Sequence, residues 1–445
     1  MKRRATVSPS IAKKLYADAR SPNLAPGDRR APRNGSTSSP KHLQPDQFRR
    51  SRRMASRRSP ARVLARLTRV AFLASVMIGL VGAGFWSVQR LRQSPQTSQQ
   101  PVNQTSTSPS VQPSLQAPTA AAVMPKQTID ELVYNVKPEA PPQHSESLQA
   151  IVDGAVALAA SKSLDTKPLS ITLIDLKGNT IAGYQQGTPR YPASVVKLFW
   201  LVVCEAQIEN SILQLDAALS ADLTAMIVHS DNDAASRIFD RITQTTSGSP
   251  LSGADYDAWL KKRLRINQFF RAAGYEGLSI SQKNYPIYSL KLDGPDGREL
   301  QMRDEQQQPI RSLITSDQAA RLMAEIYAGK AISASRSQEM MALLTRDLNP
   351  ESWKKEPDNS IAGFLGESLP TDVRFASKVG MTTKVRHEVA FIESKDGSVA
   401  YILAVFGTDP TYSQNSEILP AISNAVYTQM VEHKTHANAT KSSDG

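Results

Sequence analysis

The apolar positions of the chain predict a body that opens and closes with a helix and a hairpin. Apolar residues recur at helical spacing over 145–161, which indicates an amphipathic helix. Alternating runs around the turns at 177–179 and 395–398 predict two hairpins, and an amphipathic helix closes the body at 416–433. Between the hairpins, helical stretches are expected at 192–207, 212–228, 232–243 and 254–273.

This order of elements predicts an α/β body with two lobes. Hairpins require an antiparallel sheet, and the first and last helices are expected to pack on one of its faces. The helices in between then form a second, all-α lobe. We expect folded sequence over 126–433 and a polar tail over 434–445.

Residues 70–88 form a run of 19 residues without a charged side chain. As a helix this run would be about 28 Å long, enough to span a bilayer core. Arg62, Arg66 and Arg69 precede it and Trp86 lies near its far end, a pattern typical of an anchor with a cytoplasmic N-terminus. A cleaved signal peptide is the alternative, but 69 leading residues are too many for one. We expect an uncleaved single-pass anchor, with the later residues on the periplasmic side of the cell membrane.

The charge of the chain is concentrated in its first segment. Residues 1–69 hold 19 Lys and Arg and three acids, whereas the whole chain has a net charge of +12. This segment has too few apolar residues for a core, so we expect a disordered cytoplasmic tail. Its Arg-rich runs suit phosphate of either nucleic acid or anionic lipid, and the adjacent anchor favours lipid. Residues 89–125 are rich in Pro, Ser, Thr and Gln, which predicts an extended linker.

Composition also excludes several kinds of site. The single cysteine, Cys204, rules out an intrachain disulfide and a CxxC metal or redox motif, and it is expected to be buried packing. The six histidines show no HxxxH spacing. We therefore expect neither a metal nor another cofactor.

The stretch YPASVVKLFW, residues 191–200, holds a serine and a lysine three positions apart. Residues at this spacing share a helix face, so the Lys197 amine can reach the Ser194 hydroxyl and act as its base. Pro192 suits a first helical turn, where the helix dipole favours a developing oxyanion. The same spacing also occurs at Ser10, Ser38 and Ser352. The apolar residues around 194 distinguish this match, because they would desolvate the lysine and lower its pKa. The alternative is an ordinary core helix.

A second polar motif, Ser230-Asp231-Asn232, occurs once in the chain. Ser230 could relay a proton and Asn232 could supply an amide ligand. The alternative is a helix N-cap, for which all three residue types are favoured, and a helical stretch does follow. The two interpretations are compatible.

A third motif lies in RFASKVGMTT, residues 374–383, as Lys378-Val379-Gly380. A lysine and a glycine at a strand edge would let backbone N–H groups face a ligand, while a strand with a bulge is the alternative. Residues close to this motif could also contact substrate; they are Arg386, His387 and Glu388.

The three motifs in this order resemble those of the penicillin-recognising serine enzymes, specifically the class A β-lactamase group and its penicillin-binding-protein relatives. The resemblance covers about residues 145–433. It implies a five-stranded antiparallel sheet flanked by the N- and C-terminal helices, with an all-α lobe, and here one transmembrane helix precedes this domain. It also implies a β-lactam or a cell-wall peptide amide as substrate.

The resemblance assigns a role to each matching residue. Ser194 would be the acylated nucleophile, Lys197 its base, and Ser230 the proton donor to the leaving nitrogen. Asn232 would hold the substrate's side-chain amide, and Lys378 its carboxylate. Gly380 would belong to the strand edge that binds the substrate, and the N–H groups of Ser194 and Met381 would form the oxyanion hole.

Two departures from the family pattern bear on activity. Val379 stands where the family usually has a hydroxyl residue, although Thr382 or Thr383 could replace it. Glu276 is the only acid near the place where the family carries the glutamate that activates the deacylating water. The three motifs and the predicted anchor together lead us to expect a membrane-anchored serine hydrolase. The alternatives are a D,D-peptidase that deacylates slowly and a non-catalytic module that binds cell wall.

Overall fold

The computed structural model of the chain describes residues 128–137, 141–304 and 306–443, with side chains up to residue 435. These residues belong to one compact unit. The predicted tail (1–69), membrane anchor (70–88) and linker (89–125) all lie outside them. Within the described residues, no helix is both long enough and apolar enough to cross a membrane.

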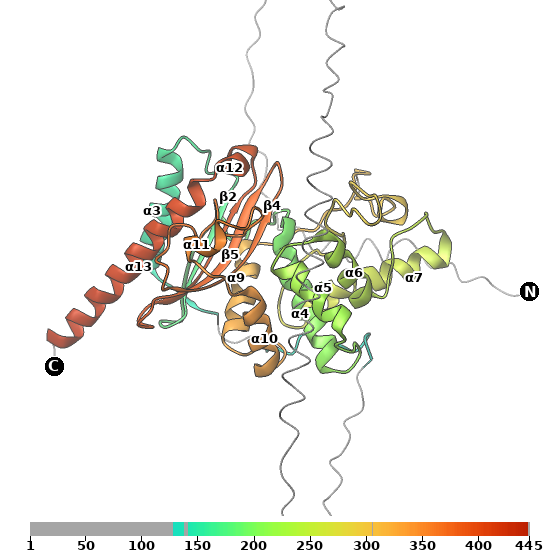
Figure 1. Cartoon of the computed structure of the whole chain (residues 1–445), viewed down its shortest axis with the longest axis horizontal. Helices are drawn as coiled ribbons and strands as arrows, with labels where there is room; N and C mark the ends of the chain where they lie inside the picture. The colour runs from blue at the N-terminus through green and yellow to red at the C-terminus, as the bar shows by residue number, and fades with distance from the viewer. Residues whose placement is uncertain (1–127, 138–140, 305, 444–445) are drawn as a thin grey trace, which may run out of the picture. The chain divides into compact units, whose positions relative to one another are not determined.

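A six-stranded sheet with the strand order β1-β3-β2-β6-β5-β4 forms one lobe (Figure 1). Its strands are β1 (Gln143–His144), β2 (Leu169–Asp175), β3 (Thr180–Tyr184), β4 (Arg374–Met381), β5 (Arg386–Glu393) and β6 (Ala400–Gly407). Strands β2 to β6 pair antiparallel, as the two hairpins predict.

The prediction of five strands, all antiparallel, is wrong at one edge of the sheet. Strand β1 adds a sixth strand and runs parallel to β3, with Gln143 opposite Thr180 and His144 opposite Ile181. Two exposed residues carry no alternating pattern, so the sequence gives no signal for this strand.

Helices cover both faces of the sheet. Helix α3 (Glu146–Ser161) packs on β2 and β3 and contacts α13 (Ile418–Ser443), and the two lie side by side in Figure 1. Helix α9 (Ser316–Tyr327) packs on β2, β5 and β6. Alternate residues of β6 join two separate apolar clusters, one at α3 and α13 and the other at α9. The predicted packing of the first and last helices on one face is therefore confirmed.

The second lobe is all-helical. Its helices are α4 (Val196–Glu209), α5 (Ala217–Ile227), α6 (Asn232–Thr243), α7 (Gly253–Arg263), α8 (Arg265–Arg271) and α10 (Ala334–Leu344). Helix α4 is its centre, because every residue from Val196 to Ile208 is buried. A helix that is apolar on all sides is expected in a core. The stretch predicted as one helix over 254–273 is divided at Leu264 into α7 and α8.

Short elements join these parts. They are the 3-10 turns η2 (Ala193–Val195) and η3 (Gly297–Glu299) and the short helices α11 (Pro350–Trp353) and α12 (Pro410–Gln414). Turn η2 contacts the edge strand β4, so the two lobes meet where the first and third motifs lie.

The C-terminal boundary differs from the prediction. Helix α13 continues to Ser443, so it includes residues 434–443, which were predicted to be a polar tail. Lys434 forms an ion pair with the buried Asp175 at 3.1 Å, which ties this part of the helix to the sheet.

Candidate active site

Ser194 lies in the turn η2, two residues before the start of α4. Its side chain is half-buried, whereas the flanking Ala193 and Val195 are buried. Ala193 has a φ of 45°, in the left-handed region that few residues other than glycine occupy. Such strain, on the order of 1–3 kcal/mol, persists only where surrounding packing enforces it, and it is common at functional sites.

Lys197 lies one turn further along, and its side chain is fully buried. Its Nζ donates to the carbonyl of Ser230 at 2.5 Å and to Oδ1 of Asn232 at 2.8 Å, and lies 3.4 Å from Oγ of Ser230. Burial lowers the pKa of Lys197 to about 7, against the opposing effect of the Asp231 charge. The apolar residues of α4 supply the desolvation that the sequence predicts.

The second motif forms the start of α6. Asp231 is the N-cap and accepts a hydrogen bond from the N–H of Ala234 at 2.6 Å. This cap fixes Asn232 at the first helical position. Ser230 precedes the cap with a φ of 55°, a second left-handed residue in the site. The N-cap interpretation of this motif is therefore confirmed, and the cap holds Ser230 and Asn232 beside the Lys197 amine.

Lys378 completes the cluster from strand β4. Its buried Nζ donates to Oγ of Ser230 at 2.9 Å and to the carbonyl of Val379 at 3.0 Å. Burial lowers the pKa of Lys378 well below its usual value, and the positive charges of Lys197 and Arg346 lower it further. One serine hydroxyl thus lies between two buried amines.

Gly380 brings the strand against the serine turn. A Cβ at this position would lie 2.7 Å from the carbonyl oxygen of Pro192 and 3.0 Å from the N of Ser194. Any side chain would separate the two segments, so glycine is required by close approach. Met381 follows at the strand end with 53% of its side chain exposed.

The structure does not join Lys197 directly to Ser194. No hydrogen bond between these two side chains is present in the described part of the chain. The hydroxyl of Ser194 is instead met by the Nδ2 of Asn284 at 3.5 Å, and the same nitrogen donates to the carbonyl of Ala193 at 3.1 Å.

Asn284 is a site residue that the sequence analysis missed. The stretch that contains it carries no motif, and only the loop's packing brings it to the serine. Glu276, the acid considered for deacylation, is exposed, and its backbone carbonyl accepts a hydrogen bond from the Gln318 side chain. It has no hydrogen bond to Ser194.

The structure places both Val379, which stands where the family usually has a hydroxyl residue, and Thr382, which could replace that hydroxyl. Val379 is buried in the apolar cluster beneath α3 and α13, so it offers no hydroxyl to a ligand. The hydroxyl of Thr382 accepts a hydrogen bond from the Lys384 N–H at 3.1 Å.

Arg386, His387 and Glu388 each bind backbone groups. The guanidinium of Arg386 donates to the carbonyls of Gly363 and Ser413, each at 2.9 Å. Nε2 of His387 donates to the carbonyl of Tyr191 at 3.0 Å. Burial lowers the pKa of His387 to about 4 and raises that of Glu388 to about 7. His387 and Glu388 are fully buried, so their contacts are structural, whereas Arg386 also lines the groove that contains Met381.

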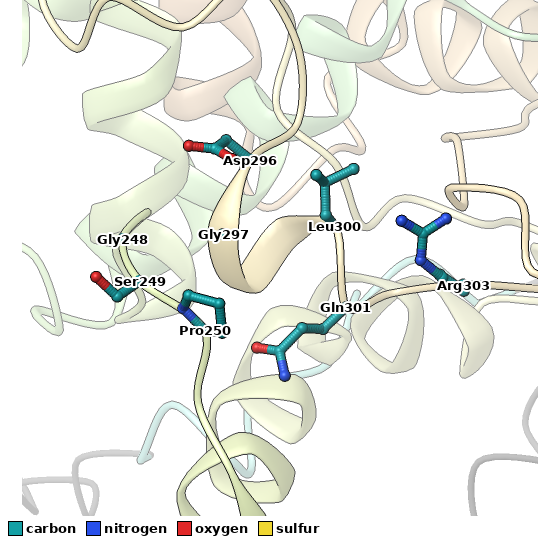
Figure 2. A pocket seen from close by; sticks show the side chains of 8 residues that line it. All are labelled: Gly248, Ser249, Pro250, Asp296, Gly297, Leu300, Gln301 and Arg303. Carbon is teal, nitrogen blue, oxygen red and sulfur yellow. The ribbon is translucent and has the colours of Figure 1, made fainter.

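Cys204, metal binding and the pockets of the described residues complete the picture. Cys204 is buried and unpaired, and burial raises its pKa. Among the described residues, no group of three or more His, Cys, Asp or Glu side chains is arranged to hold a metal ion. A cavity of about 620 Å³ is lined by residues 248–250, 296, 297, 300, 301 and 303, and none of these is a predicted site residue (Figure 2). A groove of about 930 Å³ reaches the site's edge at Met381.

Comparison with known proteins gives a family match and several similar folds. A model of the β-lactamase enzyme family matches residues 218–430, a segment that contains the second and third motifs but begins after Ser194 and Lys197. No curated protein sequence matches the chain.

Three of the similar solved structures illustrate the fold comparison. A β-lactamase from Sphaerobacter thermophilus is 18% identical, with 62% of this chain and 95% of that chain covered and a TM-score of 0.43. A β-lactamase from Chitinophaga pinensis is 14% identical, with 63% of this chain and 98% of that chain covered and a TM-score of 0.44. PBP-A is 17% identical, with 66% of this chain and 99% of that chain covered and a TM-score of 0.46.

Proposed function

We propose that the chain, whose residues 218–430 match the model of the β-lactamase enzyme family, is a serine hydrolase that forms an acyl-enzyme at Ser194. Its substrates are β-lactams or the peptide amides of the cell wall. The observation that carries the proposal is the convergence of Lys197, Ser230, Asn232 and Lys378 beside the turn that holds Ser194.

Lys197 has the geometry of a general base. A neutral amine has two N–H groups and one lone pair, and the Ser230 carbonyl and Asn232 Oδ1 accept both N–H groups. The lone pair is then left to accept the proton of the Ser194 hydroxyl. With a pKa of about 7, much of the amine is neutral near neutral pH. Catalytic contacts that are long without substrate commonly shorten when substrate binds.

Ser230 is placed to return this proton to the leaving group. Lys378 donates to its oxygen at 2.9 Å and Lys197 lies 3.4 Å from the same oxygen, so the hydroxyl hydrogen of Ser230 is free to point toward a leaving nitrogen. In acylation, the Ser194 oxygen bonds to the carbonyl carbon and its proton passes to Lys197. When the C–N bond breaks, Ser230 gives its proton to the nitrogen and takes one from Lys197.

Substrate binding uses the remaining groups of the cluster. A substrate carboxylate near Lys378 would favour the protonated amine and pair with it. Asn232 offers its amide to the substrate's side-chain amide. The N–H groups of Ser194 and Met381 supply the oxyanion hole, a role supported by the contact between Gly380 and the serine turn.

Hydrolysis of the acyl-enzyme needs a group that activates water, and the surroundings of Ser194 offer little for this step. Within the described residues, no carboxylate is hydrogen-bonded to Ser194, and the neighbouring Asn284 has an amide that cannot take a proton. This favours slow deacylation, which is the behaviour of a penicillin-binding D,D-peptidase rather than of a fast lactamase.

Labelling with a reporter penicillin tests the proposal. We expect covalent labelling of the wild-type chain, its loss in Ser194→Ala, and its retention in Ser352→Ala. Ser352 is a matched control because it has the same Ser-x-x-Lys spacing but is exposed. Equal labelling of Ser194→Ala and wild type would remove Ser194 from the mechanism. An unreactive wild type that still binds cell-wall fragments would favour the non-catalytic module.

We also propose that residues 70–88 anchor the enzyme in the membrane, with its catalytic domain outside the cytoplasm. The support is the uncharged run of 19 residues and the basic segment before it. The full chain should stay with membranes after an alkaline wash, and a variant lacking 70–88 should not. Recovery of both proteins in the wash would contradict the anchor.

A further inference from the structure

A short hairpin tip connects the nucleophile's turn to the second motif. Residues 287 and 292 pair through two backbone hydrogen bonds of 2.8 and 3.0 Å, and the turn between them closes through the Lys291 N–H and the Tyr288 carbonyl at 3.1 Å. Lys291 has a φ of 55°, which this tight turn requires. The hairpin tip, residues 287–292, is therefore an ordered element.

Both ends of this region are fixed at the active site. On one side Asn284 contacts Ser194 and the Ala193 carbonyl. On the other, the N–H of Ser289 donates to Oδ1 of Asp233 at 2.8 Å, and the Ser289 hydroxyl donates to the same oxygen. Asp233 directly follows Asn232 in α6. The hairpin tip is thus attached beside the residue assigned to the substrate's side-chain amide.

Tyr288 lies between these two attachments. It is the most exposed large apolar side chain among the described residues, at 76%. No ring contact or side-chain hydrogen bond of Tyr288 occurs in the described part of the chain. Four residues of extended chain reach at most about 14 Å, so Tyr288 stays near Asn284.

The other apolar residues of the hairpin tip are directed elsewhere. Ile287 is fully buried, and Leu290 lines a cavity of about 190 Å³ together with Ser247 and Glu299. Tyr288 does not line this cavity. An exposed aromatic ring on an ordered support contributes binding area at little entropic cost.

We propose that Tyr288 forms a wall of the substrate cleft and selects acyl donors that carry an aromatic group beyond the side-chain amide. This inference rests on the proposed function, because Asn232 orients that amide and the hairpin tip is attached at the next residue. The group beyond the amide then extends toward the Tyr288 ring, where aromatic stacking favours it.

Two penicillins that differ only in the ring test this assignment. Benzylpenicillin carries a phenylacetyl side chain, and 6-acetamidopenicillanic acid keeps the amide but replaces the ring with hydrogen. The quantity measured is the ratio of their second-order rate constants for acylation of Ser194. We expect benzylpenicillin to react faster with wild type, and Tyr288→Ala to reduce the ratio about threefold to tenfold.

Two further variants separate the ring from other effects. Tyr288→Phe should keep the wild-type ratio, because stacking needs the ring and not the hydroxyl. Leu215→Ala is the matched control, because Leu215 is also an exposed apolar residue, at 45%. It lies before α5, and the 11 residues of that helix separate it from the second motif.

The outcomes distinguish this inference from the proposed function. If Ser194 is acylated and the ratio is the same in wild type and Tyr288→Ala, the role of Tyr288 is overturned while the function stands. If Leu215→Ala lowers the ratio equally, the role of Tyr288 is likewise overturned. If wild type reacts with neither penicillin, both proposals fail.

Discussion

At the scale of single residues, the pKa of Lys197 determines how acylation should depend on pH. Burial lowers this pKa to about 7, and only the neutral amine can take the proton of Ser194. Below pH 7 the amine is increasingly protonated, so the acylation rate constant should fall about tenfold per pH unit. Stopped-flow measurement of lactam acylation between pH 5 and 9 checks this.

The corresponding variant, Lys197→Ala, should reduce acylation about 100-fold or more. Its residual rate should lose the inflection near pH 7. Persistence of that inflection without the amine would assign it to another group.

Asn284 gives a residue-scale prediction about deacylation. Its side chain lies 3.5 Å from Oγ of Ser194, so Asn284→Asp would place a carboxylate where water could be activated. We expect steady-state lactam turnover to rise about tenfold or more, while Asn284→Ala gives no increase. Glu276→Ala should leave turnover unchanged, because Glu276 is exposed and has no hydrogen bond to the serine. Turnover in Asn284→Asp no higher than in Asn284→Ala would contradict this account.

At the scale of elements, the contact between β4 and η2 sets the geometry of the site. A methyl group at Gly380 would meet backbone atoms of Pro192 and Ser194 at 2.7 and 3.0 Å, so Gly380→Ala must push the strand from the serine turn. A displacement of about 1 Å in a catalytic site can cost on the order of 100-fold in rate. We expect slower acylation with the fold retained by circular dichroism.

Gly187→Ala is the control for this element-scale prediction. A Cβ at Gly187 has nothing within 4 Å, so this variant should acylate at the wild-type rate. If Gly380→Ala also acylated normally, the close approach would have no catalytic role.

The elements also show what a sequence can and cannot predict. Hairpins and amphipathic helices follow from local periodicity, so β2 to β6 and the packing of α3 and α13 were predictable. Strand β1 is too short to have a period. The Ser-x-x-Lys spacing became informative at Ser194 because mostly apolar residues surround the lysine, and α4 is indeed buried on all sides. Asn284 was not predictable, because its contact depends on how a loop without periodicity packs against the other lobe.

At the scale of the whole molecule, a buried charge network holds the loop region to the helical lobe. Arg263 of α7 pairs with Glu299 of η3 at 2.9 Å, and both side chains are fully buried. Ser247 donates to the same carboxylate oxygen and accepts from Lys283, which also pairs with Asp240. The network thus includes the residue next to Asn284, so the stability of the lobe and the position of the site are connected.

Loss of one partner from this network should be costly to the whole fold. Arg263→Met leaves the Glu299 charge buried without its ion pair, which typically costs about 3–5 kcal/mol in the free energy of unfolding. Denaturant unfolding measures this. The double variant Arg263→Met/Glu299→Leu should recover part of the loss, because no unpaired charge remains. Lys395→Met removes an exposed pair with Asp372 and should change little, since solvent screens that pair. A loss in Arg263→Met no larger than in Lys395→Met would mean that water or neighbouring dipoles solvate Glu299 as well as the guanidinium does.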